Sequence, residues 1–377
     1  MPSRRVLLAL ATSTALLMVA LIGSGWYFSD VLWRDGLAVD HQRLPDIRVL
    51  QVQDRTVTLE ATDANKATDL GKEGTFGLEW SGGYGRLGPI RKIAGREVSR
   101  EFTPLIGAPG VGTAARLDGW AYPGDPAVAF GLPFQEVVYE SPLGPLPAWR
   151  VAGGKTWAIL VHGKNADRRE ALRTVPSIAR VGLSSLTITY RNDERATASP
   201  EGIHRFGATE WEDLEGAAKF AVTNGADSLV LVGYSMGGAI VASFLSRSAL
   251  ADRVQGVILD SPVLNFGAAV EYGAARRRVP APVTAVAQRL ATLRFGVNWS
   301  ALDYAGAGNG LRVPTLLFHG DADSQVPVAG SDAFAAAHPS LVTYLRTPGA
   351  EHVRSWNVDP LRYETAVTEF LRGLPRR

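Results

Sequence analysis

The fold is decided by the stretch LVLVGYSMGGAIVA at residues 229–242. An apolar strand runs directly into GYSMGG at residues 233–238, and an apolar helical run follows. This is the G-x-S-x-G pattern in the strand-to-helix context that presents a serine on a sharp turn. Glycines flank the serine because neighbouring backbones approach too closely for side chains there. The pattern therefore predicts Ser235 as a nucleophile at a helix N-terminus, where N–H groups favour an oxyanion.

Apolar strands alternate with helical stretches on both sides of this motif, from about residue 134 onward. The alternation indicates βαβ units, and so an α/β fold with a mostly parallel central sheet. Between the sixth and seventh strands, about residues 262–312 are long enough to form a small cap, with an apolar helix near 283–295. The predicted strands are 136–140, 148–152, 157–161, 185–190, 228–232, 256–259, 315–318 and 342–345, and the predicted helices are 167–180, 208–223, 236–246 and 331–337.

A nucleophilic serine needs a histidine base, and in this strand–turn–helix context the order along the chain is serine, acid, histidine. Of the 6 histidines, His319, His338 and His352 follow Ser235. His352 lies in a Pro-Gly loop after the last predicted strand, whereas His319 precedes the candidate acids and His338 adjoins a helix end. We therefore predict His352 as the base.

Two aspartates follow the strand 315–318 and are candidates for the acid that orients His352. We favour Asp323 over Asp321, because the earlier residue is better placed to hold the tight turn through backbone N–H groups. Asp260, at the end of the preceding strand, is a weaker candidate with an alternative role in a turn or cap.

The oxyanion needs two backbone donors. The N–H groups of Met236 and Lys164 are the predicted pair, because Lys164 lies in the glycine turn after the strand 157–161. His162 is expected as a buried, hydrogen-bonded support. The candidate pocket residues, at the ends of strands, are His162, Gly163, Arg191, Asn192 and Tyr234.

From about residue 134 to 373 the chain resembles the α/β-hydrolase superfamily, on His162-Gly163, the 233–238 elbow, the HGDAD run at 319–323 and His352. Within it, the chain is similar to exported or membrane-bound bacterial serine hydrolases of the esterase and prolyl-oligopeptidase-like branches. The resemblance implies the α/β-hydrolase fold and a triad of Ser235, Asp323 and His352. The segments 190–194, 210–213 and 356–360 look like features of a subfamily.

Composition excludes several classes of function. With 39 basic and 37 acidic residues the net charge is +2, and the basic residues are scattered, so we expect no nucleic acid partner. The chain has no cysteine, which excludes a thiol nucleophile, a disulfide framework and a thiolate metal site. The predicted chemistry needs neither a metal nor an organic cofactor.

The N-terminus carries an uncharged stretch from Val6 to Phe28. As a helix it would be roughly 35 Å long, enough for a hydrocarbon core of about 30 Å. Arg4 and Arg5 precede it and aromatic residues follow it, so we expect a retained single-pass anchor with the body outside the cytoplasm. The alternative is a signal peptide cleaved near Gly23 or Gly25, with secretion of the body.

The predicted organisation is an anchor at 1–30, a small β-rich accessory segment at 31–133 and a catalytic domain at 134–377. The predicted activity is hydrolysis of an ester, on a small-molecule or lipid-like substrate, by a serine hydrolase at the outer face of the membrane. The alternatives are a serine peptidase, an acyltransferase of the same fold and an inactive binding or scaffold protein.

Overall fold

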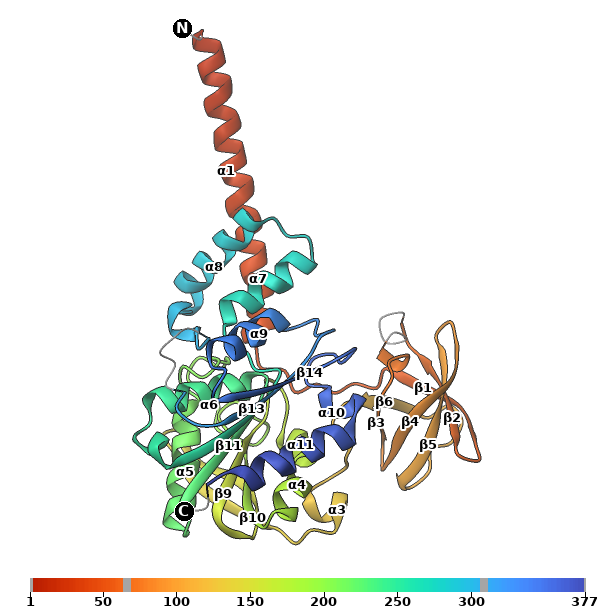
Figure 1. The fold of residues 1–377 in the computed structure, drawn as a ribbon. Helices are drawn as coiled ribbons and strands as arrows, with labels where there is room; N and C mark the ends of the chain where they lie inside the picture. The colour runs from red at the N-terminus through yellow and green to blue at the C-terminus, as the bar shows by residue number, and fades with distance from the viewer. Residues whose placement is uncertain (1–2, 64–68, 306–310, 376–377) are drawn as a thin grey trace.

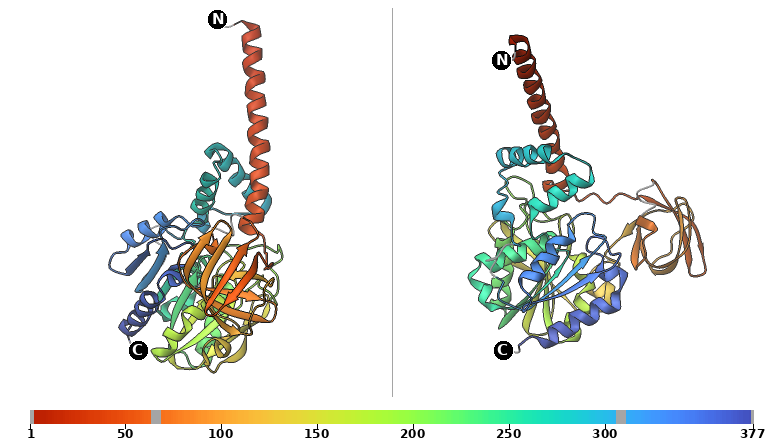
Figure 2. Two further views of the ribbon diagram at one scale, coloured as in Figure 1. Left: turned by 90° about the vertical axis from the view of Figure 1, so that its right-hand side faces the viewer. Right: turned by 45° about the horizontal axis from the view of Figure 1, so that its top comes forward.

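A computed structural model describes residues 3–63, 69–305 and 311–375, which form three parts (Figure 1). A long N-terminal helix leads to a body built on a large sheet, and a small β-barrel stands beside that body (Figures 1 and 2). The predicted α/β-hydrolase fold, with a cap between the sixth and seventh strands of the sheet, is confirmed. Residues 306–310, which belong to the predicted cap, lie outside the described residues. So do residues 1–2 of the predicted anchor, 64–68 of the accessory segment and 376–377 of the catalytic domain.

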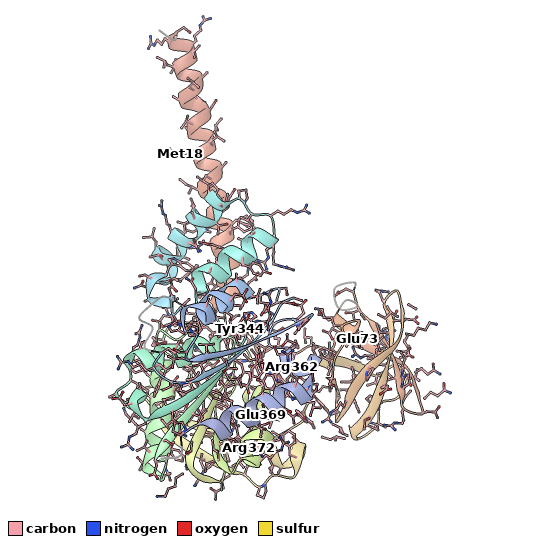
Figure 3. All side chains as sticks on the ribbon, viewed as in Figure 1. Met18, Glu73, Tyr344, Arg362, Glu369 and Arg372 are labelled. Carbon is pink, nitrogen blue, oxygen red and sulfur yellow. The ribbon has the colours of Figure 1, made fainter. Side chains whose placement is uncertain are left out.

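The N-terminal helix α1 spans Arg4–Leu32 and continues as a π-helical turn, η1, at Trp33–Leu37. Its first buried residue is Gly25, whereas Met18, on the part that projects from the body in Figure 3, is 58% exposed. The projecting residues 4–24 extend over about 31 Å at about 1.5 Å per residue. By length and composition α1 can cross a membrane, and a signal sequence would have the same properties.

The small domain is a closed six-stranded barrel in the order β1-β2-β5-β4-β3-β6. Closure pairs the strands at both edges, so that none is left open for pairing with another chain. Branched apolar residues such as Val49, Val57 and Leu59 alternate with more exposed ones and fill the interior. The strands are β1 Ile47–Gln53, β2 Thr56–Ala61, β3 Phe76–Trp80, β4 Gly83–Ala94, β5 Glu97–Ile106 and β6 Ala114–Asp118.

The body contains an eight-stranded sheet in the order β14-β13-β12-β11-β9-β10-β8-β7. The strands from β9 to β14 pair in parallel, and only β7 and β8 pair antiparallel to their neighbours. All eight predicted strands are present, most of them one to three residues longer: β7 Gln135–Ser141, β8 Gly144–Val151, β9 Gly154–Val161, β10 Leu183–Ile188, β11 Ser228–Tyr234, β12 Val254–Asp260, β13 Thr315–Gly320 and β14 Val342–Thr347.

Helices cover both faces of this sheet, which explains its continuously apolar central strands. Alternate residues of β11 lie in two different cores, with Leu231 on one face and Val232 on the other. Helices α5 Trp211–Thr223 and α6 Met236–Arg247 pack on the first face, and α4 Val175–Arg180 and α11 Pro360–Gly373 on the second. The remaining short helices are α3 Pro126–Phe130, η2 Arg168–Arg173, η3 Ala249–Arg253, η4 Ser300–Leu302, α9 Val328–Ala337 and α10 Ser355–Val358.

The cap consists of α7 Phe266–Arg276 and α8 Ala281–Phe295 and lies at the base of α1 (Figure 1). Gly25 of α1 packs so closely on α8 that an added Cβ would overlap the side chain of Val286. Arg294 of α8 bonds to Ser29 and forms an ion pair of 2.7 Å with Asp30. The last third of α1 is therefore part of the folded body.

The barrel meets the body at the segment 356–360, which sequence analysis could only mark as distinctive. The Asn357 amide donates to the carbonyl of Thr75 at 2.7 Å and to that of Gly119 at 2.9 Å, and the Thr75 N–H donates to the Asn357 carbonyl at 2.8 Å. Asp359 accepts the Arg362 N–H at 3.0 Å and is the N-cap of α11, with Pro360 as its first helical residue. The segment thus both docks the barrel and starts α11.

Candidate active site

Ser235 occupies the turn between β11 and α6 with φ 50° and ψ −115°, a strained conformation for a residue with a side chain. A Cβ added to Gly233 would lie 2.7 Å from the Gly237 carbonyl oxygen, and one added to Gly237 would overlap the carbonyl of Val161. Only glycine fits at these two positions, because backbone cannot yield as a flexible side chain can. The elbow geometry expected from the glycines is thus present.

Loops after β13 and β14 bring two further side chains to this serine. The Nε2 atom of His352 lies 2.8 Å from the Ser235 hydroxyl oxygen, and its Nδ1 atom lies 2.7 Å from Oδ2 of Asp323. The structure therefore brings together the three residues predicted as a triad, although 117 positions separate Ser235 from His352.

Asp323 is buried and held from several directions. Its Oδ1 accepts the N–H groups of Gln325 and Val326, both at 2.8 Å, and its Oδ2 also lies 3.1 Å from His319 Nε2. Burial alone would raise the pKa of Asp323, but the hydrogen bonds from His319 and His352 outweigh it and hold the pKa well below its usual range. Asp323 is thus a carboxylate at neutral pH.

Asp321 has the separate role that the turn chemistry predicts. Its Oδ1 accepts the Gly349 N–H at 2.7 Å, which ties the loop after β13 to the Pro-Gly turn that precedes His352. Its side chain is exposed, and within the described part of the chain it forms no hydrogen bond or ion pair with His319 or His352.

His319 is a support that sequence analysis set aside because of its place in the chain order. It is buried, with Nδ1 2.7 Å from the Ser331 hydroxyl and Nε2 beside Asp323. The available signal was a polar residue at the end of an otherwise apolar strand, next to the candidate acid. His319 therefore helps to fix the carboxylate that contacts His352.

The turn after β9 lies directly against the nucleophile. A Cβ added to Gly163 would be 3.1 Å from the Cβ of Ser235. Within the described residues no backbone acceptor bonds the Lys164 N–H, and Met236 is the first residue of α6, where N–H groups lack an intrahelical partner. Both predicted oxyanion donors therefore flank Ser235 with their N–H groups free.

Glu170, which sequence analysis missed, holds this turn from behind. Its Oε2 accepts the Gly163 N–H at 2.7 Å, and its Oε1 accepts the Trp120 indole N–H at 3.3 Å. Nothing in the local sequence marks Glu170, because it belongs to a short 3-10 helix rich in charged residues.

Four of the five candidate pocket residues are not pocket residues, and only Gly163 lines the cavity. Arg191 is buried in a bidentate pair with Asp213, and Asn192 bonds to the backbone of Ser199 and Ile203. The Arg191 guanidinium is thus paired with a carboxylate of α5, and the Asn192 amide is bonded within its own loop. Tyr234 is buried with its hydroxyl 2.5 Å from that of Thr174, and His162 pairs with Asp193 at 2.7 Å, as expected for a support.

Asp260 lies beneath the elbow and not beside His352. Its backbone carbonyl accepts the Ser235 N–H at 3.0 Å. Burial raises the pKa of its side chain to about 6, although the charge of nearby Arg173 opposes that rise. Its part in the site is therefore structural, which agrees with its ranking as a weaker candidate for the acid.

A cavity of about 830 Å³ opens above this arrangement. Ser235, His352, Gly163 and Lys164 lie at its floor, and its walls come from α1, α7 and α8. The size is that of a pocket for a small organic molecule. In the described part of the chain no group of three or more His, Asp or Glu side chains could hold a metal ion.

Comparisons with known proteins agree with this architecture. A family model described as "alpha/beta hydrolase fold" matches residues 212–289, and one described as "Domain of unknown function (DUF8805)" matches residues 48–118, which form the barrel. No curated protein sequence matches the chain.

Two solved structures share the fold of the body. The esterase Pf2001 of Pyrococcus furiosus is 20% identical, with a TM-score of 0.53 over 67% of this chain and 95% of that chain. A putative hydrolase from Agrobacterium vitis is 17% identical, with a TM-score of 0.51 over 63% of this chain and 99% of that one. The body has the α/β-hydrolase fold.

Proposed function

We propose that the chain is a serine hydrolase that cleaves a carboxylic ester through an acyl-enzyme. The observation that carries the proposal is the line of two hydrogen bonds from Ser235 through His352 to Asp323, at the floor of a cavity. A serine, a base and an orienting carboxylate in this geometry are the groups that acyl transfer requires.

In the first step, His352 Nε2 takes the Ser235 proton while the oxygen attacks the ester carbonyl carbon. The Asp323 carboxylate stabilises the imidazolium, and the N–H groups of Met236 and Lys164 donate to the oxyanion. Collapse expels the alcohol, which receives its proton from His352. Water then attacks the acyl-enzyme with His352 again as base, releasing the carboxylic acid and restoring the Ser235 hydroxyl.

The fold and the triad also suit a peptidase or an acyltransferase, in which an amide or a second alcohol replaces the ester or water. We favour an ester because the cavity walls are mainly apolar, and because one similar structure is an esterase. An inactive scaffold is a weaker reading, because the expected catalytic side chains are all present in bonding geometry.

We further propose that α1 stays attached as a membrane anchor, with the body outside the cytoplasm. Residues 25–32 pack on the cap, where Gly25 lies against Val286 and Ser29 bonds to Arg294. Cleavage near Gly25 would therefore cut α1 at the edge of this folded interface. Arg4 and Arg5 favour a cytoplasmic N-terminus. Mass spectrometry of the protein from membranes tests this, since a signal peptide would leave a chain that starts after residue 23 or 25.

The enzyme proposal is tested by labelling the full-length protein with a fluorophosphonate, in which the Ser235 oxygen displaces fluoride at phosphorus. We expect labelling of the wild type and none of Ser235→Ala. A panel of nitrophenyl esters and aminoacyl amides then separates esterase from peptidase. Labelling that persists in Ser235→Ala, or a labelled protein that cleaves only amides, would overturn the ester assignment.

A further inference from the structure

One face of the anchor helix forms a wall of the cavity above Ser235. Phe28, Val31, Leu32 and Asp35 all line that cavity. Their spacing of three, four and seven residues places them on one side of a helix. The same turns are also partly open to solvent, as at Tyr27, which is 59% accessible. The anchor therefore contributes directly to the space above the nucleophile.

Helix α7 forms the facing wall with the same periodicity. Phe266, Val270 and Ala274 line the cavity, and Val263, just before this helix, bonds through its N–H to the Ser235 carbonyl at 3.0 Å. From Phe266 to Arg276 the lined length is about 15 Å at about 1.5 Å per residue. The cavity is therefore elongated, and it runs from the nucleophile between α7 and α1.

The far end of this space points along α1 toward its membrane-spanning part. The lining residues on η1 and α1 run from Gly36 back to Phe28, and the first buried residue of α1, Gly25, lies only three residues earlier. Next to Gly36, Asp35 of η1 forms an ion pair of 2.7 Å with Arg277, the first residue after α7. Both side chains are about half exposed, and the pair links η1 to the end of α7.

We propose that this space is an acyl channel, and that the substrate is a long-chain ester that reaches Ser235 from the membrane along α1. The inference rests on the proposed function and specifies its substrate class. A hydrocarbon chain that leaves a bilayer loses a favourable environment unless apolar surface receives it. The walls supply that surface, because most of the residues that α1 and α7 turn toward the cavity are apolar.

The channel is tested with full-length protein in phosphatidylcholine vesicles and two fluorophosphonates that differ only in chain length, ethyl and hexadecyl. The readout is the ratio of their second-order labelling rates. We expect the hexadecyl probe to label the wild type at least tenfold faster. Ala274→Trp, which fills the channel, should lower the ratio at least tenfold, whereas Ala275→Trp, on the exposed side of α7, should leave it unchanged.

A second pair of variants, on α1, distinguishes a blocked channel from a folding defect. Val31→Trp places the same bulk on the opposite wall, and Val19→Trp, at a 69% exposed position of the projecting helix, is its control. Among the channel variants that still react with the ethyl probe, a hexadecyl-to-ethyl rate ratio equal to that of the wild type would overturn the channel. Failure of both probes on the wild type would instead overturn the serine hydrolase itself, and the channel with it.

Discussion

The two sides of Ser235 are built in different ways. On the side of β13 and β14, Asp323 takes hydrogen bonds from two backbone N–H groups and faces two histidines. On the side of α1 and the cap, the residues above the serine are mainly apolar. The polar links there, from Arg294 to Ser29 and from Arg277 to Asp35, lie between the helices and not at the serine.

The difference separates reactivity from selectivity. Proton transfer needs heavy atoms held within about 2.6–3.2 Å, and hydrogen bonds impose such distances. Selection of a substrate depends on the shape of a cavity, which packing controls and which tolerates small changes more readily. Substitutions of the side chains that transfer or orient the proton should therefore abolish turnover, while substitutions on the packed side should change stability or substrate preference.

Removal of the nucleophile should have the largest effect. We expect Ser235→Ala to lower kcat for a nitrophenyl ester by roughly four to six orders of magnitude, because the covalent step is lost. The thermal midpoint should stay close to that of the wild type, which a parallel melting curve checks. Turnover retained by the purified variant would remove the serine from the mechanism.

The two aspartates after β13 give a sharper comparison. Asp323→Asn should lower kcat by about four orders of magnitude, because the amide no longer stabilises the imidazolium or its tautomer. Asp321→Asn changes the same atoms two residues away, where the side chain only bonds the Gly349 N–H. Its kcat should change by no more than a few fold, and equal losses in both variants would contradict the assignment of the acid.

Ionisation of the buried Asp260 side chain should make the free energy of unfolding depend on pH. Its folded pKa of about 6 exceeds the ordinary value, so the native state loses stability relative to the unfolded chain as pH rises from 4 through 6. Asp260→Asn cannot ionise and should gain up to about 3 kcal/mol relative to the wild type across that window. Unfolding curves at pH 4, 5, 6 and 7 measure the difference, with the exposed Asp252→Asn as control. A difference that stays constant with pH would contradict it.

The packed side should show the smallest effect, on stability. Gly25→Ala places a methyl group against Val286, and overpacking of this kind costs about 1–3 kcal/mol. Gly23→Ala adds the same group where nothing lies within 4 Å. Thermal melting of both variants in detergent should show a lower midpoint for Gly25→Ala alone. Identical midpoints would mean that the α1–α8 contact adds no stability.

Local sequence was sufficient for the strands and for the elbow. The central strands are continuously apolar because both faces of the sheet are covered, so hydrophobic pattern marks them directly. Gly233 and Gly237 mark the tight turn around Ser235. A side chain at either position would collide with a backbone carbonyl, that of Gly237 or that of Val161. Pro348-Gly349 likewise marked the turn that precedes His352.

The pocket prediction failed for a physical reason. A polar residue at the end of a strand is a pocket candidate until its partners are known. Arg191 finds Asp213 on a helix 22 positions later, and Asn192 is satisfied by its own loop. Glu170 is the reverse case. It has no distinctive sequence context, but the fold brings its carboxylate to the Gly163 N–H beside Ser235 and to the indole of the distant Trp120.

The sequence by itself determined the order of strands and helices, the nucleophile's turn and the candidates for base and acid, because these depend on neighbours within a few residues. Only the tertiary structure decided that a predicted membrane helix packs on the cap and faces Ser235. Nothing in the local pattern relates Val31 to Val270, since contacts between distant segments arise when the whole chain closes around its cores.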